Sequence, residues 1–390
     1  MKILFVAPRM PFPPLKGDRV RPYNFVKELS GRHSIDLCTF CEGEEDMSGI
    51  SEMRKYCRNV ETVQLSRFSS YINTARGLIN FRPLQVNYYY SGEMAKKIRA
   101  MSTSNNYDVV HFVLNRMTPY RRFCNGEKVV LDHIDALSLN MIRRAKNEHS
   151  ILKKAVFNYE AFNLSGYEKR IRGTYDASIV SSKIDKDALG DDTIEVIPNG
   201  VDTGYFRPVS RDKDIDFIFT GNMNYFPNVN AALYFAEEIL PKILRTRPDA
   251  SFYIVGIDPS KEVRALHDGK NIIVTGFVDD IREYMNRSRV FVAPLRSGSG
   301  IQNKILEAFA CGVPVVSSTC GNAGISAKDG EHLLIADDPM RFVSALIELL
   351  DNKEKRDSLS EKARCLAEKE FSWSKSTRLL EGVYNRVIAG

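Results

Sequence analysis

The chain has 390 residues, more than one ordinary domain holds, which predicts two domains of about 180 residues each. With 43% hydrophobic and 27% charged residues, its composition is that of a globular protein and excludes a disordered or fibrous chain. No apolar stretch reaches about 18 residues, which argues against a transmembrane helix. The first residues lack a cleavage-site pattern and predict a strand rather than a signal peptide.

Charge is unevenly distributed along the chain. Residues 1–175 carry 28 Lys and Arg against 17 Asp and Glu, a net +11, and the remainder carries 27 against 32, a net −5. A basic first half predicts an anionic partner, such as lipid headgroups or a lipid-linked phosphate. No nucleic-acid-binding motif accompanies it, so we expect no nucleic-acid partner.

The seven cysteines are scattered, and Cys38 and Cys41 form a lone C-x-x-C. This pattern is typical of reduced thiols and does not predict a zinc site or another metal centre. We therefore expect a cytoplasmic protein. The basic first half allows a further interpretation, peripheral contact with the inner face of an anionic membrane.

The first predicted strand is residues 3–7, and a proline-rich turn with Gly17 follows it. This turn lacks G-x-G-x-x-G, so the usual dinucleotide fingerprint is absent. Residues 68–101 then place apolar and aromatic side chains at helical spacing, among them Phe68, Tyr71 and Ile72, with arginines nearby. Such a segment either lies on an anionic membrane or forms an ordinary domain helix whose arginines extend into solvent.

Polar residues follow the next predicted strand, residues 107–112. Asn115 and Arg116 come at its C-terminal end, where ligands of α/β proteins gather. His111 lies within the strand itself. It either points into a site or is a satisfied strand residue.

Another polar group follows the strand that begins at residue 128. Asp132, His133 and Asp135 cluster just past it. They either contact sugar hydroxyls and take a proton from an acceptor, or Asp135 caps the helix that follows. That long helical stretch, residues 137–172, is again basic.

The second half alternates strands and helices from Ile215 onward. This order predicts six strands joined by crossovers in a doubly wound parallel sheet. Within it, residues 290–293 predict a buried strand, residues 297–300 a glycine loop, and a helix with one apolar face begins at Ile301. The N-terminus of such a helix offers unpaired N–H groups and a positive dipole end, which suit a phosphate.

Lys304 and Glu307 lie on successive turns of this helix. Lys304 would add a positive charge for a diphosphate, and the Glu307 carboxylate could accept hydrogen bonds from both hydroxyls of a ribose. Diphosphate first and ribose next is the order in which a nucleotide-sugar lies. The alternative interpretation is a glycine loop that only makes a turn and a helix whose charges are solvated.

The run LEAFACGVPVV at 306–316, with IEVIPNGVD at 194–202 and the closing FSW at 371–373, resembles GT-B glycosyltransferases of the family-4 type. Within that family it is most similar to bacterial sugar transferases of exopolysaccharide and capsule assembly. The resemblance implies an α/β fold with two Rossmann-like domains facing across a cleft. Residues 1–192 would bind the acceptor, with the final helix 374–390 packed on them, and residues 193–373 would bind the nucleotide-sugar.

The resemblance also implies a reaction. A sugar would move from a nucleotide-diphosphate sugar to a hydroxyl of a glycan or lipid-linked acceptor, with retention and without metal or cofactor. The donor base would be uridine or guanosine. A sugar-nucleotide 2-epimerase and a non-catalytic nucleotide-sugar-binding partner share the architecture and remain alternatives.

Three positions depart from the family pattern. The first of two family glutamates falls on Ser299, Val113 stands where many relatives carry a histidine, and no cation follows Gly221. The resemblance therefore leaves the diphosphate to the glycine loop, the helix dipole, Lys304 and Arg296.

Together, the residue pattern and the resemblance give candidates for binding the donor, for binding the acceptor and for catalysis. Donor-binding candidates are Gly17, Gly221, Asn222, Phe277, Val278, Arg296, Gly298, Ser299, Gly300, Ile301, Gln302, Asn303, Lys304 and Glu307. Acceptor-binding candidates are Asp18, Arg19, Asn115 and Arg116, and catalytic candidates are Asp132, Asp135 and His111.

Overall fold

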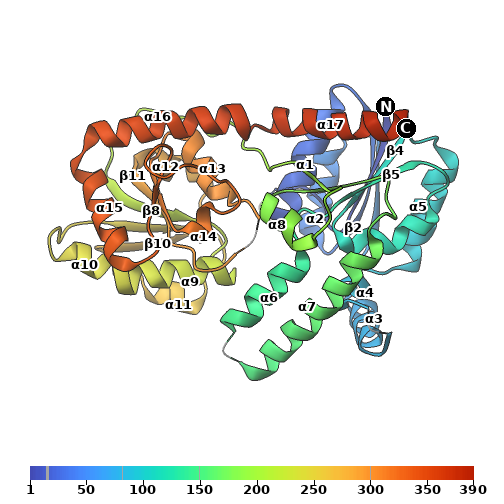
Figure 1. Cartoon of the computed structure of the whole chain (residues 1–390), viewed down its shortest axis with the longest axis horizontal. Coiled ribbons are helices and arrows are strands. Elements are labelled where there is room, and N and C mark those ends of the chain that lie inside the picture. The colour runs from blue at the N-terminus through green and yellow to red at the C-terminus, as the bar shows by residue number, and fades with distance from the viewer. Residues whose placement is uncertain (15–16, 81, 149, 299) are drawn as a thin grey trace. The chain divides into compact units, whose positions relative to one another are not determined.

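The computed structural model describes residues 1–14, 17–80, 82–148, 150–298 and 300–390. The chain divides into two compact units (Figure 1). The first unit comprises Met1–Pro198 together with Ser376–Gly390, and the second unit comprises Asn199–Lys375. The first unit thus extends six residues beyond the boundary expected at 192, because its last strand lies at Glu195–Val196.

The first unit is built on a seven-stranded parallel sheet with the order β3-β2-β1-β4-β5-β6-β7. Its central strands are buried on both faces, as parallel strands covered by helices are. The strands are β1 (Lys2–Ala7), β2 (Ser34–Cys41), β3 (Asn59–Gln64), β4 (Val109–Val113), β5 (Lys128–Asp132), β6 (Ala177–Val180) and β7 (Glu195–Val196).

The helices of the first unit are shorter than the sequence pattern predicts. The segment 68–101 forms three helices, because Pro83 precedes the second and the Ser91 side chain caps the third. The stretch 137–172 is likewise broken before Ser150, which caps α7. The elements are α1 (Gly17–Ser30), α2 (Glu44–Met53), α3 (Arg67–Asn80), α4 (Leu84–Tyr88), α5 (Gly92–Ser104), the 3-10 helix η1 (Asn115–Phe123), α6 (Leu137–Asn147), α7 (Ile151–Ile171), α8 (Lys183–Leu189) and most of α17 (Trp373–Ala389).

The second unit contains a six-stranded parallel sheet with the order β10-β9-β8-β11-β12-β13. In both sheets the chain builds outward from a central first strand in two directions, which confirms the predicted doubly wound α/β fold. The strands are β8 (Ile215–Thr220), β9 (Phe252–Val255), β10 (Ile272–Gly276), β11 (Ser288–Ala293), β12 (Val315–Ser317) and β13 (Leu334–Ile335).

Helices cover both faces of this second sheet and bury one large apolar core. They are α9 (Phe226–Tyr234), the π-helix η2 (Phe235–Ile239), α10 (Leu240–Leu244), α11 (Lys261–Ala265), α12 (Ile281–Arg287), α13 (Asn303–Ala310), α14 (Thr319–Asn322), α15 (Pro339–Asp351) and α16 (Lys353–Glu370). Among all the helices that the structure describes, none is long and apolar enough to span a bilayer.

The first and last segments of the second unit lie side by side. The Val201 amide donates a 2.6 Å hydrogen bond to the Phe371 carbonyl, and Val201 forms a parallel bridge with Ser372. A Cβ on Gly200 would lie 2.4 Å from the Trp373 backbone nitrogen, so only glycine lets the two segments approach this closely. The side chain of the preceding residue, Asn199, donates to Asn303 Oδ1 over 3.3 Å.

The glycine contact can be tested by Gly200→Ala. The added methyl group overlaps backbone atoms of Trp373, which cannot rotate away, so we expect a loss of about 1–3 kcal/mol in unfolding free energy, measured by urea denaturation. Gly166→Ala in α7 is the matched control, because its Cβ meets no atom within 4 Å and alanine favours a helix by about 1 kcal/mol. Equal stability of the two variants would contradict the close packing at Gly200.

Candidate functional site

Two glycines bring neighbouring loops into contact at the carboxyl edge of the second sheet. Gly221 follows β8 with a φ of 146°, and Gly256 follows β9 with a φ of 156°. A Cβ on Gly256 would lie 1.7 Å from the Gly221 carbonyl oxygen, so no other residue fits there. This packing fixes the loop after β8 against its neighbour.

The glycine loop delays the start of α13. Gly298 and Gly300 have φ values of 140° and 68°, and α13 begins at Asn303 rather than at Ile301 as predicted. Ile301 is instead buried in the core, and Gln302 is the N-cap residue. Lys304 is therefore the second residue of the helix, nearer to its free N–H groups than the sequence suggested. Ser299 lies outside the described residues.

The Lys304 ammonium lies at the end of β8. It donates a hydrogen bond to Asn228 Oδ1, and Asn228 Nδ2 donates to the Asn222 carbonyl over 2.9 Å. The ammonium also lies 4.8 Å from the centre of the Phe219 ring, and a Cβ on Gly221 would be 3.4 Å from Nζ. The segment after Gly221 carries no cation of its own, and Lys304 places one beside that glycine.

Lys304 and Glu307 both have shifted pKa values. Burial lowers the pKa of Lys304 to about 8, against the opposing effect of the Glu307 charge. Burial likewise raises the pKa of Glu307 to about 7, and the Lys304 charge opposes it. The structure describes no ion pair for Lys304, whose partners are an amide oxygen and an aromatic face. An anion arriving here would meet a cation that is already desolvated.

Arg296 is directed to a different part of α9. Its Nε donates to Asn230 Oδ1 over 3.1 Å, and its guanidinium lies 4.6 Å from the Tyr234 ring centre. Lys304 contacts the start of the same helix through Asn228. A direct contact between Arg296 and a diphosphate stays a prediction.

The remaining donor candidates surround this edge of the sheet. Gly276 ends β10 with a φ of 71°, the next side chain, Phe277, is exposed, and Val278 packs on the core. Asn222 Oδ1 accepts a hydrogen bond from the Asn224 amide over 2.9 Å.

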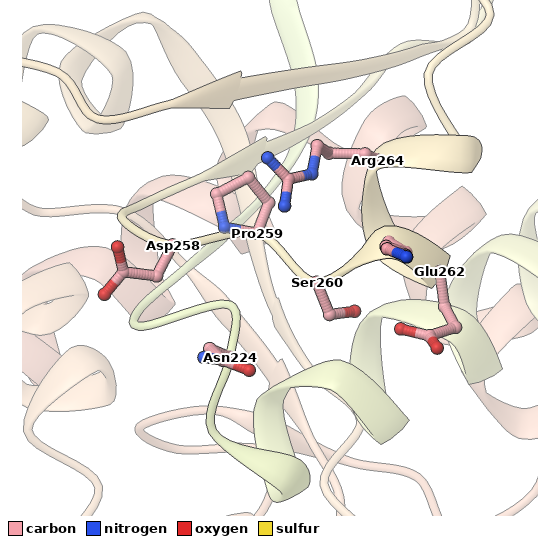
Figure 2. A pocket seen from close by; sticks show the side chains of 7 residues that line it. Asn224, Asp258, Pro259, Ser260, Glu262 and Arg264 are labelled. Carbon is pink, nitrogen blue, oxygen red and sulfur yellow. The ribbon is translucent and has the colours of Figure 1, made fainter.

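A cavity of about 440 Å³ opens beside these loops (Figure 2). Its lining comes from the loop after β8, from the segment that leads into α11 and from α11 itself: Asn224, Asp258, Pro259, Ser260, Lys261, Glu262 and Arg264. None of the predicted donor residues that the structure describes lines it. We therefore place the candidate donor site at Lys304 and not in this cavity.

A buried ion pair lies at the carboxyl edge of the first sheet. Arg21 Nε donates to Asp132 Oδ2 over 2.6 Å, and Arg21 Nη1 donates to the Ile197 carbonyl over 2.8 Å. Burial alone would raise the pKa of Asp132, but the charge of Arg21 and the nearby His111 ring outweigh it and lower that pKa to about 2. Asp132 is thus a permanent anion at neutral pH.

His111 extends this cluster to the C-terminal helix. Its Nε2 lies 3.8 Å from Asp132 Oδ2, and its Nδ1 lies 2.8 Å from the Tyr384 hydroxyl of α17. Burial lowers the pKa of His111, against the effect of Asp132. His111, Asp132, Arg21 and Tyr384 are all fully buried. Contact of His111 or Asp132 with a substrate therefore stays a prediction.

Asp135 is less enclosed than Asp132. Its Oδ1 accepts a 3.2 Å hydrogen bond from Ser181 Oγ, and burial together with the Asp185 charge raises its pKa. The helix-capping interpretation of Asp135 is wrong, because the N-cap of α6 is Ala136, which has no side-chain cap and whose amide donates to Asp185 Oδ1.

Backbone strain marks the same edge of the first sheet. Leu114 follows β4 with a φ of 66°, and Ile134 follows β5 with a φ of 61°. Non-glycine residues rarely adopt this conformation, which costs about 1–3 kcal/mol and tends to occur at functional sites. The Ile134 amide donates to Asp132 Oδ1 over 2.9 Å, so the buried carboxylate holds the strained residue in place.

The acceptor candidates separate into two groups. Asp18 accepts a 3.1 Å hydrogen bond from Arg9 Nη1 and lies 3.8 Å from Arg116. The structure thus brings Asp18 and Arg116 together. Arg19 instead pairs with Asp46 over 3.2 Å, and the buried Asn115 side chain donates to Glu168 over 3.2 Å.

Gly17 is the first residue of α1. A Cβ there would meet no described atom within 4 Å, and its φ is not in the left-handed region. Neither the shape of the turn nor its packing therefore requires a glycine at this position.

The residues of these clusters that were not predicted include Arg9, Arg21, Asn228 and Tyr384. Each contacts a partner elsewhere in the chain. The sequence separation between the partners ranges from 9 residues for Arg9 and Asp18 to 273 residues for Tyr384 and His111. Of the four, only Arg21 has a weak local signal, because it is a charged residue among the apolar residues Val20, Phe25, Val26 and Leu29, which recur at helical spacing.

Comparison with known proteins identifies a family signature in the second unit. Residues 214–352 match the model of the family "Glycosyl transferases group 1". This region of the chain carries the group 1 glycosyltransferase signature. The matched region contains both the Gly221 loop and all of α13, so the family signature covers the cluster around Lys304.

The sequence of this glycosyltransferase is similar to those of two further proteins, and the share of the chain that is matched differs between them. It is 23% identical over 380 residues to an "Uncharacterized 44.6 kDa protein in cps region" of Klebsiella pneumoniae, covering 90% of this chain and 91% of that protein. It is 31% identical over 179 residues to the UDP-Gal:alpha-D-GlcNAc-diphosphoundecaprenol alpha-1,3-galactosyltransferase of Escherichia coli. That match spans 41% of this chain and about half (46%) of the E. coli enzyme.

The solved structure of sucrose-phosphate synthase from Thermosynechococcus elongatus has the same fold. Its TM-score is 0.75 at 15% identity, and the match covers 100% of this chain and 99% of that chain. At this identity the match confirms the GT-B fold of the glycosyltransferase and carries no information on its substrates.

The buried ion pair of this glycosyltransferase predicts a large loss of stability in Asp132→Asn. The substitution leaves the Arg21 charge buried without an anion, which costs about 3–5 kcal/mol of unfolding free energy. Chemical denaturation would measure this loss. Asp351→Asn is the control, because Asp351 pairs with Arg247 on the surface and should cost less than about 1 kcal/mol.

The same pair sets a pH dependence. The folded-state pKa of Asp132 lies below its unfolded value of about 3.9. The contribution of Asp132 to stability is therefore complete above that value and is lost as the pH falls toward about 2.

Equal stabilities of Asp132→Asn and Asp351→Asn would contradict the assignment of a stabilising buried ion pair to Asp132 and Arg21.

Proposed function

We propose that this glycosyltransferase transfers a hexosyl group from a nucleoside-diphosphate sugar to a hydroxyl group of a glycan or lipid-linked acceptor. The observation that carries the donor half of this proposal is the Lys304 ammonium. It is half-buried beside Gly221, lies at the start of α13, and has an amide and an aromatic ring as partners. A diphosphate supplies the anion that this position lacks.

The surrounding groups fit the rest of a nucleotide. The first N–H groups of α13 lie next to Lys304 and suit phosphate oxygens. Glu307 follows one turn later, where its carboxylate can accept two ribose hydroxyls. The corner Gly276–Val278 is open at Phe277 and offers backbone groups to a base. We assign diphosphate neutralisation to Lys304 and the helix, a role that needs no metal ion.

The acceptor half of the proposal is supported by the relatives. One lies in a capsule region, and another is named for transfer to a diphosphoundecaprenol-linked sugar. We infer a similar acceptor class and a role in surface polysaccharide or glycoconjugate synthesis. The raised pKa of Asp135 makes this residue our candidate base for the acceptor hydroxyl.

In the proposed reaction, the bond between sugar C1 and the diphosphate oxygen breaks with its electron pair on the diphosphate. The acceptor oxygen bonds to C1 on the same face, which retains the anomeric configuration. The hydroxyl proton passes to the Asp135 carboxylate. Lys304 stabilises the charge that grows on the leaving diphosphate.

Nucleotide binding without added metal tests the donor site. We expect UDP or GDP to raise the melting temperature of the wild-type protein. Lys304→Ala should weaken that nucleotide about tenfold to a hundredfold, because a charge-assisted hydrogen bond contributes about 1.5–3 kcal/mol. Lys362→Ala, an exposed lysine of α16, is the matched control and should bind normally.

Turnover separates the enzyme from its alternatives. With a glycan or lipid-linked acceptor, the wild type should form a new glycoside and Lys304→Ala should not. Binding of a nucleotide-sugar without any transfer would favour a binding partner. Release of an epimerised nucleotide-sugar would favour an epimerase. A folded protein that binds no nucleoside diphosphate would overturn the proposal.

The pKa values of Lys304 and Glu307 predict how nucleotide affinity depends on pH. Below about pH 7 Glu307 is protonated and accepts ribose hydroxyls poorly, and above about pH 8 the free protein loses the Lys304 charge. Affinity measured by titration calorimetry should therefore be highest between these values. Glu307→Gln should remove the loss on the acid side and keep the loss on the alkaline side. A flat profile in the wild type would show that these groups do not contact the nucleotide.

A further inference from the structure

The first half of helix α3 presents apolar side chains to solvent. Phe68 and Tyr71 are 76% and 66% exposed, and Ile72 lies beside them at the spacing of one helix face. The polar face of α3 points inward instead. Ser70 is buried, and the Asn73 side chain donates to the Tyr90 carbonyl over 3.0 Å. This orientation is the reverse of that of an ordinary surface helix.

The hairpin of α6 and α7 has a second exposed apolar region. Ile151 and Leu152, at the start of α7, are 87% and 77% exposed, and Val156 continues the exposed surface. Ile142 of α6 is also exposed. Elsewhere the two helices pack closely, and the Arg144 guanidinium of α6 lies 4.7 Å from the Phe157 ring of α7. The exposed residues therefore belong to a built hairpin.

The two regions are joined through α4. Glu160 of α7 is buried and accepts hydrogen bonds from the backbone amides of Leu84 and Gln85, over 2.8 and 3.1 Å. These amides begin α4, and Tyr88 of α4 contacts Tyr71 of α3 edge to face. Figure 1 shows α3 and the α6–α7 hairpin extending from the same side of the first unit.

The charges around these apolar residues are almost all positive. Residues 67–80 contain Arg67 and Arg76 and no acidic residue. Residues 137–159 contain five basic residues against one acid, Glu148. Lys153 and Lys154 are exposed directly beside Ile151 and Leu152.

We propose that α3 and the α6–α7 hairpin form a membrane-docking face that binds an anionic bilayer. We define this face by its exposed apolar residues: Phe68, Tyr71, Ile72, Ile142, Ile151, Leu152 and Val156. Aromatic and aliphatic side chains next to lysine and arginine suit the boundary between headgroups and acyl chains. Anionic headgroups complement the excess of positive charge, and each lysine or arginine near such a surface adds attraction.

The docking face is a separate proposal from the nucleotide site. It depends on the proposed function only in that the acceptor would be lipid-linked. A lipid-linked acceptor lies in a bilayer, and a protein held at that surface meets it at high local concentration. The face belongs to the first unit, and the candidate nucleotide site belongs to the second. The two can therefore be tested separately.

Vesicle binding by the full chain tests the proposal. We expect co-sedimentation with phosphatidylcholine vesicles that contain phosphatidylglycerol, weakening as salt is raised. Ile151→Ser with Leu152→Ser should abolish this binding, and so should Phe68→Ser with Tyr71→Ser. Lys153→Glu with Lys154→Glu should weaken it at least about tenfold, because each cation near the surface contributes to attraction.

Matched controls lie in the second unit. Met340→Ser removes an exposed apolar side chain from α15, and Lys362→Glu reverses an exposed charge on α16; both should leave vesicle binding unchanged. All the substituted residues are exposed, so the variants should fold, and unchanged UDP or GDP binding would show this. If every variant lost nucleotide binding as well, the cause would be a defect in the donor site or in folding, and not in the docking face.

Three outcomes would overturn the docking face. The first is equal binding of wild type and the serine variants to anionic vesicles. The second is binding to pure phosphatidylcholine vesicles as strong as to anionic ones. The third is a dimer, detected by light scattering, that the serine substitutions dissociate while no vesicle binding occurs, which would make a second copy of the chain the occupant.

Discussion

Burying a cation away from water is unfavourable unless an anion or a set of acceptors compensates it. Both units place a cation at the carboxyl edge of a parallel sheet, and their partners differ. Arg21 has a carboxylate at 2.6 Å and a carbonyl at 2.8 Å, and these partners fix α1, β5 and residue 197 to one another. Lys304 has an amide oxygen and an aromatic ring. The Arg21 charge is paired within the protein, and we propose that an anionic ligand pairs with the Lys304 charge.

This contrast explains which parts of the candidate site follow from sequence. The strand, glycine loop and helix around Lys304 follow from local signals: an apolar run, closely spaced glycines and a helical apolar period. The start of α13 was predicted two residues early, because the left-handed conformation of Gly300 cannot be read from its identity alone. Asn228 is 76 residues from Lys304 in the chain, and no local pattern marks such a pair.

The first unit was less predictable for the same physical reason. Its doubly wound sheet follows from alternating strands and helices, but Arg21 and Asp132 lie 111 residues apart and meet only in the folded chain. The apolar stripe of α3 was also visible as a period. The direction in which this apolar face points could not be predicted. An amphipathic pattern shows which residues share a face, and only tertiary packing decides whether that face points inward or outward. The buried polar face of α3 is such a case.

The contact between Tyr384 and His111 has a consequence for synthesis of the chain. The first unit is interrupted, because its sheet is complete by residue 196 whereas α17 comes last in the sequence. The second unit is continuous from 199 to 375 and can fold as soon as it leaves the ribosome. The first unit, although synthesised earlier, keeps His111 without its tyrosine partner until the last residues emerge. The order in which the two units reach their final packing is therefore opposite to the order in which they begin.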